Sequence, residues 1–209
     1  MPEELSPRER RHQRTQQAIL EAARQIIREE GVDSLSMRAI ADRIDYSPAG
    51  LYEYFGSKEE IVGGVCSEGF LRLTQRLQST DPSLPPLDYL VEMGLSYISF
   101  AMSNSDFFML MFTNAPLVAP ANFPQDEAPE TLLRRSPAFQ SLYRAVQRCV
   151  DAGVFIERPD FDVLGIAIAC WQIVHGISML NLTTMRIKPI DPARQRVTLR
   201  TLLSGFIQG

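Results

Sequence analysis

A chain of 209 residues, 45% of them hydrophobic, can bury a core and has room for one small and one larger domain. Its formal charge of -4 argues against a protein that coats nucleic acid regardless of sequence, because such binding needs broad neutralisation of phosphates. Cys66, Cys149 and Cys170 are odd in number and far apart, which favours buried thiols in a reducing compartment over a disulfide framework.

The N-terminus is polar and lacks the apolar stretch of a secretory signal, so we expect a cytoplasmic protein. Residues 163–180 are apolar enough to suggest a membrane span. They contain Gln172, His175 and Gly176, however, and no aromatic belt flanks them. We therefore expect a helix buried on two sides within protein, and no membrane contact.

Apolar residues recur at helical spacing along almost the whole chain, and no segment shows the sustained alternation of a strand. The predicted fold class is all-α, with about nine helices. Four prolines interrupt residues 113–136, so this stretch is predicted to be a long irregular link that allows only a short helix at 128–135. The other helices are expected at residues 15–30, 37–44, 48–55, 57–79, 87–102, 106–112, 137–153, 161–184 and 192–206.

Residues that favour helix ends mark the first few boundaries. Gly31 stops the first helix, and Ser36 is placed to cap the second. Ser47 followed by Pro48 starts the third, because serine accepts from free backbone donors and proline has no N–H to satisfy. Residues 57–60 form a predicted capping box, in which Ser57 and Glu60 satisfy each other's backbone donors.

Two short helices joined by a turn of about four residues, after a longer supporting helix, match a helix-turn-helix, whose second helix enters the major groove. An ordinary three-helix unit would show similar caps, so periodicity alone leaves both interpretations open. We predict a basic arm at residues 1–14, a DNA-binding domain at 15–60, and a helical domain for ligand binding and dimerisation at 61–209.

Exposed polar and small residues around the second and third helices are the candidate DNA contacts. Arg38 is suited to a bidentate contact with guanine, although a solvated surface arginine is the simpler alternative. Ala49 could touch a thymine methyl group, and tyrosine and lysine side chains suit phosphate oxygens. The predicted DNA-binding residues are Ser36, Arg38, Ser47, Ala49, Gly50, Tyr52, Tyr54 and Lys58.

Cationic residues precede the first predicted helix. They are Arg8, Arg10, Arg11, His12 and Arg14. Such an arm could follow the DNA backbone or enter the minor groove, and an exposed disordered tail is the alternative.

Residues 35–58, LSMRAIADRIDYSPAGLYEYFGSK, resemble the signature of the TetR family of bacterial transcriptional regulators, and the likeness extends over about residues 15–65. It implies a nine-helix dimer in which the positions that match Ser36, Arg38, Ala49, Gly50, Tyr52, Tyr54 and Lys58 contact DNA. The two-fold symmetry of a dimer in turn predicts a palindromic operator, with one DNA-binding domain for each half-site. The resemblance also implies a repressor that a small-molecule effector releases from its operator. Two residues depart from the pattern: Asp45 stands where the family usually has glycine, and Glu53 puts a negative charge on the recognition helix.

The residues Trp171-Gln172-Ile173-Val174-His175-Gly176 are similar to a Trp-x-x-x-His-Gly pattern found in one group of TetR ligand-binding domains. The helix around them is apolar on most sides, and the last helix adds a second apolar stripe, so we expect a homodimer through the last two helices. Candidate effector-binding residues are Tyr97, Phe100, Asn104, Phe108, Phe112, Tyr143, Trp171 and His175. The alternative for each of them is ordinary core packing.

Other functions have less support. The sequence contains no nucleophile elbow, phosphate loop or dinucleotide fingerprint, which argues against an enzyme. With only two histidines and scattered cysteines, it predicts no metal site and no cofactor. A helical enzyme, or an interaction protein of the same fold that has lost DNA binding, are the alternatives to a regulator.

Overall fold

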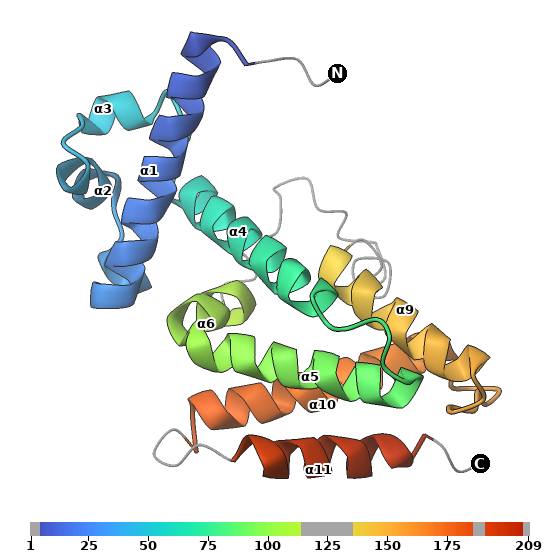
Figure 1. Cartoon of the computed structure of the whole chain (residues 1–209). Coiled ribbons are helices and arrows are strands. Elements are labelled where there is room, and N and C mark those ends of the chain that lie inside the picture. The colour runs from blue at the N-terminus through green and yellow to red at the C-terminus, as the bar shows by residue number, and fades with distance from the viewer. Residues whose placement is uncertain (1–4, 114–135, 186–190, 207–209) are drawn as a thin grey trace. The chain divides into compact units, whose positions relative to one another are not determined.

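The computed structural model describes residues 5–113, 136–185 and 191–206 (Figure 1). Within these ranges the chain forms nine α-helices and one short 3₁₀ helix, with no strand beyond an isolated bridge, which confirms the all-α prediction. The helix expected at 128–135 lies outside the described residues. The elements are α1 Pro7–Glu30, η1 Val32–Ser34, α2 Met37–Arg43, α3 Pro48–Leu51, α4 Lys58–Gln78, α5 Pro86–Ser103, α6 Ser105–Thr113, α9 Pro137–Asp151, α10 Val163–Leu182 and α11 Pro192–Ser204.

The chain divides into two compact units. Unit 1 consists of Met1–Gly69 and Asp106–Phe123, and unit 2 consists of Phe70–Ser105 and Pro124–Gly209. The boundary therefore falls inside α4, and α6 belongs with the N-terminal helices.

The first helix begins at Pro7, so the expectation that it starts at Thr15 is wrong. The reason is a capping box that precedes the apolar stripe: the Ser6 hydroxyl accepts from the backbone N–H of Glu9 at 3.3 Å, and the Glu9 carboxylate accepts from the N–H of Ser6 at 2.7 Å. Pro7 occupies the first helical position, where a missing N–H costs nothing. Local capping therefore extends α1 through the arginine-rich residues.

The core of unit 1 lies where α1, α2, α3 and the first half of α4 meet. The side chains of Ile19, Ile40, Leu51 and Ile61 each have 0% exposed surface. Fully burying an aliphatic side chain of this size contributes about 1.5–3 kcal/mol. Helix α2 packs against α1, and α3 packs against α2, so these buried residues hold the two short helices beside α1 (Figure 1).

The third helix is shorter than predicted. It ends at Leu51, and the chain continues through a tight turn to Phe55. The backbone N–H groups of Tyr52, Glu53 and Tyr54 bond carbonyls three residues earlier, a tighter pattern than that of an α-helix. The residues expected at the end of the recognition helix therefore lie in this turn.

The cap of α4 differs by one residue from the predicted box. Ser57 accepts from the N–H of Glu60 at 3.2 Å, as expected. The Glu60 carboxylate instead accepts from the N–H of Gly56 at 2.7 Å. Both free donors before α4 are satisfied in this way.

In unit 2, α5 is the helix against which α9, α10 and α11 all pack. Gly94 of α5 permits this approach, because a β-carbon there would lie 3.2 Å from side-chain atoms of both Val174 and Leu199. Two ion pairs, Arg196 with Glu92 and Arg200 with Asp88, tie α11 along α5. The two acidic residues are four positions apart on α5, and the two arginines are four positions apart on α11. Both ion pairs therefore lie along the same side of the contact between these helices.

Helix α10 is long and apolar enough to cross a membrane, with a mean hydropathy of 1.8. Only 28% of its most apolar 18-residue window is buried in the single chain. One side packs on α5 and α9, and large apolar side chains remain exposed on α10 and α11: Leu180, Val197 and Leu202 are 50%, 65% and 46% exposed.

Candidate nucleic-acid interface

The two short helices of unit 1 begin with the predicted serine caps. The Ser36 hydroxyl accepts from the N–H of Ala39 at 3.1 Å, and the Ser47 hydroxyl accepts from the N–H of Gly50 at 3.0 Å. Asp45 lies in the connecting turn with φ 53°, a left-handed conformation that aspartate tolerates better than most residues. The departure from glycine is therefore compatible with a helix-turn-helix.

Arg38 is the most exposed of the candidate contacts that carry a charge. Its side chain is 87% exposed, and its Nε lies 4.0 Å from the Asp42 carboxylate, which is itself 71% exposed. An exposed pair at this distance contributes little, so the guanidinium is available to a ligand. The Tyr52 ring is 58% exposed, and Ala49 and Glu53 are also exposed on the recognition segment. Lys58 is half-buried as the first residue of α4.

Gly50 was predicted to be one of the DNA-binding residues, but its surroundings give another reason for a glycine. A β-carbon at this position would lie 2.6 Å from Cε1 of Tyr46. The missing side chain therefore makes room for the Tyr46 ring, which packs across the start of α3.

Tyr54, which was predicted to be an exposed DNA contact, is half-buried. Its ring stacks on His12 with 4.6 Å between centroids and 27° between planes, and its hydroxyl lies 3.4 Å from that of Tyr46. The hydrogen bond to Tyr54 raises the pKa of Tyr46. Sequence reasoning missed this contact, although His12 lies seven residues before the buried Ile19 and so shares its helix face.

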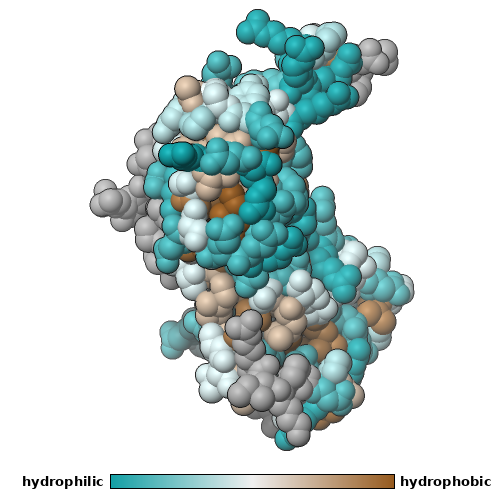
Figure 2. Space-filling model, turned by 90° about the vertical axis from the view of Figure 1, so that its left-hand side faces the viewer, coloured by the Kyte–Doolittle hydropathy of each residue, from teal (hydrophilic) through white to brown (hydrophobic). Residues whose placement is uncertain are grey.

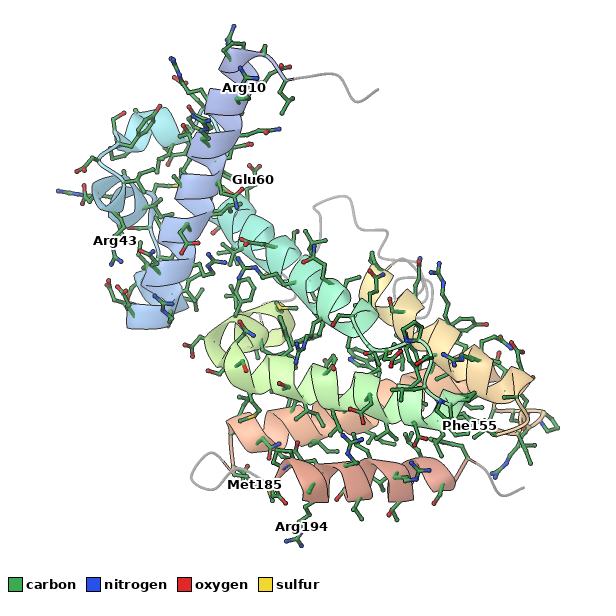
Figure 3. All side chains as sticks on the ribbon, viewed as in Figure 1. Arg10, Arg43, Glu60, Phe155, Met185 and Arg194 are labelled. Carbon is green, nitrogen blue, oxygen red and sulfur yellow. The ribbon has the colours of Figure 1, made fainter. Side chains whose placement is uncertain are left out.

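Ion pairs connect α1 to α2 and to α4 around the helix-turn-helix. The Arg43 guanidinium lies 2.9 Å from Glu29 and 3.2 Å from Glu30, which ties the end of α2 to the end of α1. The Arg24 guanidinium lies 3.1 Å from Glu68 of α4. Figure 3 shows Arg43 at the opposite end of unit 1 from Arg10, and Figure 2 looks onto the largely hydrophilic side that carries these short helices.

A second group of polar atoms lies between α5 and α10 in unit 2. The Tyr97 hydroxyl lies 2.9 Å from Nδ1 of His175 and accepts from Nε1 of Trp171 at 3.2 Å. Phe139 of α9 adds an edge-to-face contact with Trp171 at 6.5 Å. Burial lowers the pKa of His175 and raises that of Tyr97, because burial disfavours the charged form of each group.

The other predicted effector-binding residues lie apart from this group or have structural partners. Asn104 donates its amide to the carbonyl of Phe100 at 2.9 Å at the end of α5, and Phe100 is buried. Tyr143 is half-buried on α9. The rings of Phe108 and Phe112 lie 4.8 Å apart between centroids and are tilted by 50°. Both are on α6, which belongs to unit 1, whereas the other six residues belong to unit 2.

The three cysteines are free and buried, as predicted. Burial raises the pKa of Cys66 to about 11 and those of Cys149 and Cys170 to about 12. Among the described residues, no three histidine, cysteine or acidic side chains are placed together to hold a metal ion.

A capped helix-turn-helix joined to a larger helical unit is the architecture of DNA-binding transcriptional regulators. The sequence pattern of the bacterial regulatory proteins of the tetR family matches residues 19–65, and that of the tetracyclin repressor-like C-terminal domain matches residues 90–203. The second match alone spans more than half of the chain. The chain belongs to the tetR family, which confirms the class of protein that the sequence predicted.

Individual relatives are similar over part of the chain. The HTH-type transcriptional regulator UidR of Escherichia coli K12 is 36% identical over 80 residues, which are 38% of this chain and 41% of UidR. The HTH-type transcriptional repressor KstR of Rhodococcus jostii RHA1 is 30% identical over 104 residues, 50% of this chain and 48% of KstR. The chain thus matches less than half the length of either relative.

Solved structures share the fold along almost the whole chain. A protein of unknown function from Rhodococcus sp. RHA1 superposes with a TM-score of 0.74 at 22% identity, covering 92% of this chain and 95% of the other. The PfmR regulator of Thermus thermophilus superposes with a TM-score of 0.62 at 23% identity, covering 91% of this chain and 97% of PfmR.

Proposed function

We propose that the chain is a transcriptional repressor whose residues 15–60 read a palindromic operator, one half-site per protomer. The observation that supports this proposal is the exposed Arg38 guanidinium in a unit whose two short helices both begin with a serine cap. A planar guanidinium matches O6 and N7 of guanine, and each such bidentate contact discriminates against a wrong base by about 1–3 kcal/mol. The name of the relative KstR supports repression rather than activation.

The remaining contacts divide by chemistry. Ala49 faces the bases and fits a thymine methyl group, and Tyr52 and Lys58 bind phosphate oxygens. Ser36 and Ser47 hold the helix starts through their caps. Gly50 and Tyr54 act indirectly, because both support the Tyr46 ring. Glu53 remains exposed and disfavours nearby phosphates, which limits where the segment can approach the backbone.

A palindromic operator has two half-sites and needs two DNA-binding domains. A homodimer through α10 and α11 supplies them. Leu180, Val197 and Leu202 form exposed apolar surface on these helices, and exposed patches of this kind mark interaction sites. Packing α10 and α11 of two chains around a two-fold axis would cover the open side of α10. A protein partner accounts for this apolar helix as well as a membrane would, and it also accounts for Gln172 and His175 within it.

Residues 61–209 bind a small-molecule effector that releases the operator. Tyr97, Trp171 and His175 offer polar atoms beside aromatic rings, a combination typical of ligand sites. An effector acts if it binds one conformation better than another, and a coupling of about 1–3 kcal/mol suffices. The protein works in the cytoplasm as a regulator rather than an enzyme, in keeping with its family.

Arg38→Ala tests the proposal. Genomic fragments bound by the wild-type protein are selected, and affinity for one of them and for random duplex is measured by fluorescence anisotropy. We expect Arg38→Ala to lose about tenfold to a hundredfold in preference for the selected fragment. Sedimentation should show the same oligomer as the wild type, because Arg38 lies outside α10 and α11. Unchanged preference would refute the role of Arg38.

The same titration separates the repressor from an interaction protein of the same fold. A wild-type chain without preference for any fragment over random duplex, with or without a cell extract of small molecules, would favour the interaction protein. Retained preference would exclude it.

A further inference from the structure

The first two turns of α1 form a cationic surface that the helix-turn-helix itself does not include. Residues 5–14 contain four arginines and one glutamate in a chain whose net charge is -4. The glutamate is Glu9, whose carboxylate accepts from the N–H of Ser6 in the cap, and this hydrogen bond lowers the pKa of Glu9. The Glu9 carboxylate is therefore held in the cap at the start of the helix. The four arginines are the remaining charged groups of this surface.

These arginines differ from the others of unit 1. Arg24 and Arg43 pair with glutamates and hold helices together. Across the described part of the chain, no acidic side chain pairs with any of the four arginines at the start of α1, namely Arg8, Arg10, Arg11 and Arg14. The end of α1 at the top of Figure 2 is predominantly hydrophilic, and Figure 3 labels Arg10 there.

The orientation of this surface is set by His12. Its ring stacks on Tyr54, which lies in the turn after the recognition helix. Arg8 lies four residues before His12 and shares its helix face, and Arg11 lies three residues after Arg8 at the edge of that face. Arg10 and Arg14 line a shallow hollow with Gln13 and Gln17 on another side.

We propose that Arg8 and Arg11 bind phosphates of the DNA backbone just outside the base pairs read by α3, with His12 as the positioning residue. The proposal rests on the proposed function and adds a second contact surface to it. An α-helix with its side chains is about 10–12 Å wide, whereas the minor groove of B-DNA is about 6 Å wide. Helical residues 7–14 therefore track phosphates and do not enter the minor groove as an extended arm would.

Salt dependence provides the test, because each neutralised phosphate releases counterions. Binding of the full-length protein is measured from low to moderate salt on an operator duplex extended by about one helical turn on each side, on one trimmed to the half-sites, and on random duplex. Arg8→Gln and Arg11→Gln are compared with Arg28→Gln, which removes an exposed arginine from the far end of the same helix.

We expect Arg8→Gln and Arg11→Gln each to lower the salt slope by about two units on the extended operator, one for each half-site. The slope should change little on the trimmed operator, and Arg28→Gln should match the wild type on all duplexes. Slopes equal to that of Arg28→Gln on every duplex would overturn the proposal. A wild type without sequence preference would refute the proposed function alone, since lower slopes on random duplex would still support a phosphate-binding surface.

The positioning role of His12 has its own comparison. His12→Ala removes the ring that stacks on Tyr54, and His12→Phe keeps a ring but no imidazole. We expect His12→Ala to lower the salt slope on the extended operator and to speed amide exchange in residues 7–14, with both effects absent in His12→Phe. Wild-type slope and exchange in His12→Ala would show that the stack does not position the arginines.

Discussion

The hydroxyl of Tyr97 lies 2.9 Å from Nδ1 of His175 and 3.2 Å from Nε1 of Trp171, so one buried oxygen joins α5 to two residues of α10. An indole nitrogen only donates, so the hydroxyl accepts from Nε1 of Trp171. The direction of the bond to His175 depends on the tautomer of the imidazole, since a hydroxyl both donates and accepts.

Tyr97→Phe should destabilise the fold. It leaves the Trp171 and His175 nitrogens without this partner, at a cost of about 1–3 kcal/mol in the free energy of unfolding. Urea unfolding followed by Trp171 fluorescence measures the change. Tyr52→Phe, at an exposed tyrosine, is the control and should unfold like the wild type. Equal stability of the two variants would mean that water replaces the lost hydroxyl.

Stability should fall below neutral pH partly through His175. Burial lowers the pKa of His175 from its ordinary value of 6.5, so the unfolded chain takes up the proton first as pH falls. The contribution of the neutral His175 to the free energy of unfolding is complete above pH 6.5. It is lost as the pH falls from there toward the lowered pKa. Urea unfolding from about pH 8 to about pH 5 should show a shallower decline for His175→Gln than for the wild type. Parallel curves would contradict this.

Gly50→Ala should disturb the recognition segment. Its β-carbon would lie 2.6 Å from Cε1 of Tyr46, so the ring must shift. Because Tyr46 is 40% exposed and can shift, we expect a loss near the low end for overpacking, about 1 kcal/mol. In the double variant Tyr46→Ala/Gly50→Ala the two losses should not add, and a cycle of unfolding measurements tests this. Additive losses would exclude the clash.

Gly176→Glu should separate the proposed dimer. Nothing lies within 4 Å of a β-carbon at Gly176, so the single chain accommodates the change, and glutamate favours a helix more than glycine does. At an interface through α10 the carboxylate would be buried without a partner. Sedimentation velocity should show a shift toward monomer, whereas Gln75→Glu, exposed on α4, should leave the dimer intact. A dimeric Gly176→Glu would place the interface elsewhere.

The three thiols should resist alkylation in the folded protein. Their pKa values are raised to about 11 or 12, so very little thiolate is present near pH 8. Mass spectrometry after iodoacetamide treatment should find Cys66, Cys149 and Cys170 unmodified in buffer and modified in urea. Rapid labelling of one thiol in buffer would show that its surroundings open.

Much of the helix-turn-helix was predictable because its signals are local. Ser36 and Ser47 cap helices within three residues of themselves, and Asp45 adopts its left-handed turn at the predicted place. The start of α1 is also set by a local signal, the capping box of Ser6 and Glu9. It was predicted from the apolar stripe instead, which begins later in the helix.

Contacts between distant residues could not be read in this way. The stack of His12 on Tyr54 joins residues more than one helix apart. Among the effector candidates, helical spacing placed Phe108 and Phe112 with Tyr97, whereas the fold assigns α6 to the other unit.

The sequence by itself determined the helices, their caps and the class of protein, because backbone hydrogen bonding and apolar periodicity act over a few residues. Only the tertiary structure decided which rings meet, which arginines are paired and which remain open to a ligand. The reason is that side-chain contacts depend on the packing of whole helices, whose crossing positions no short stretch of sequence specifies.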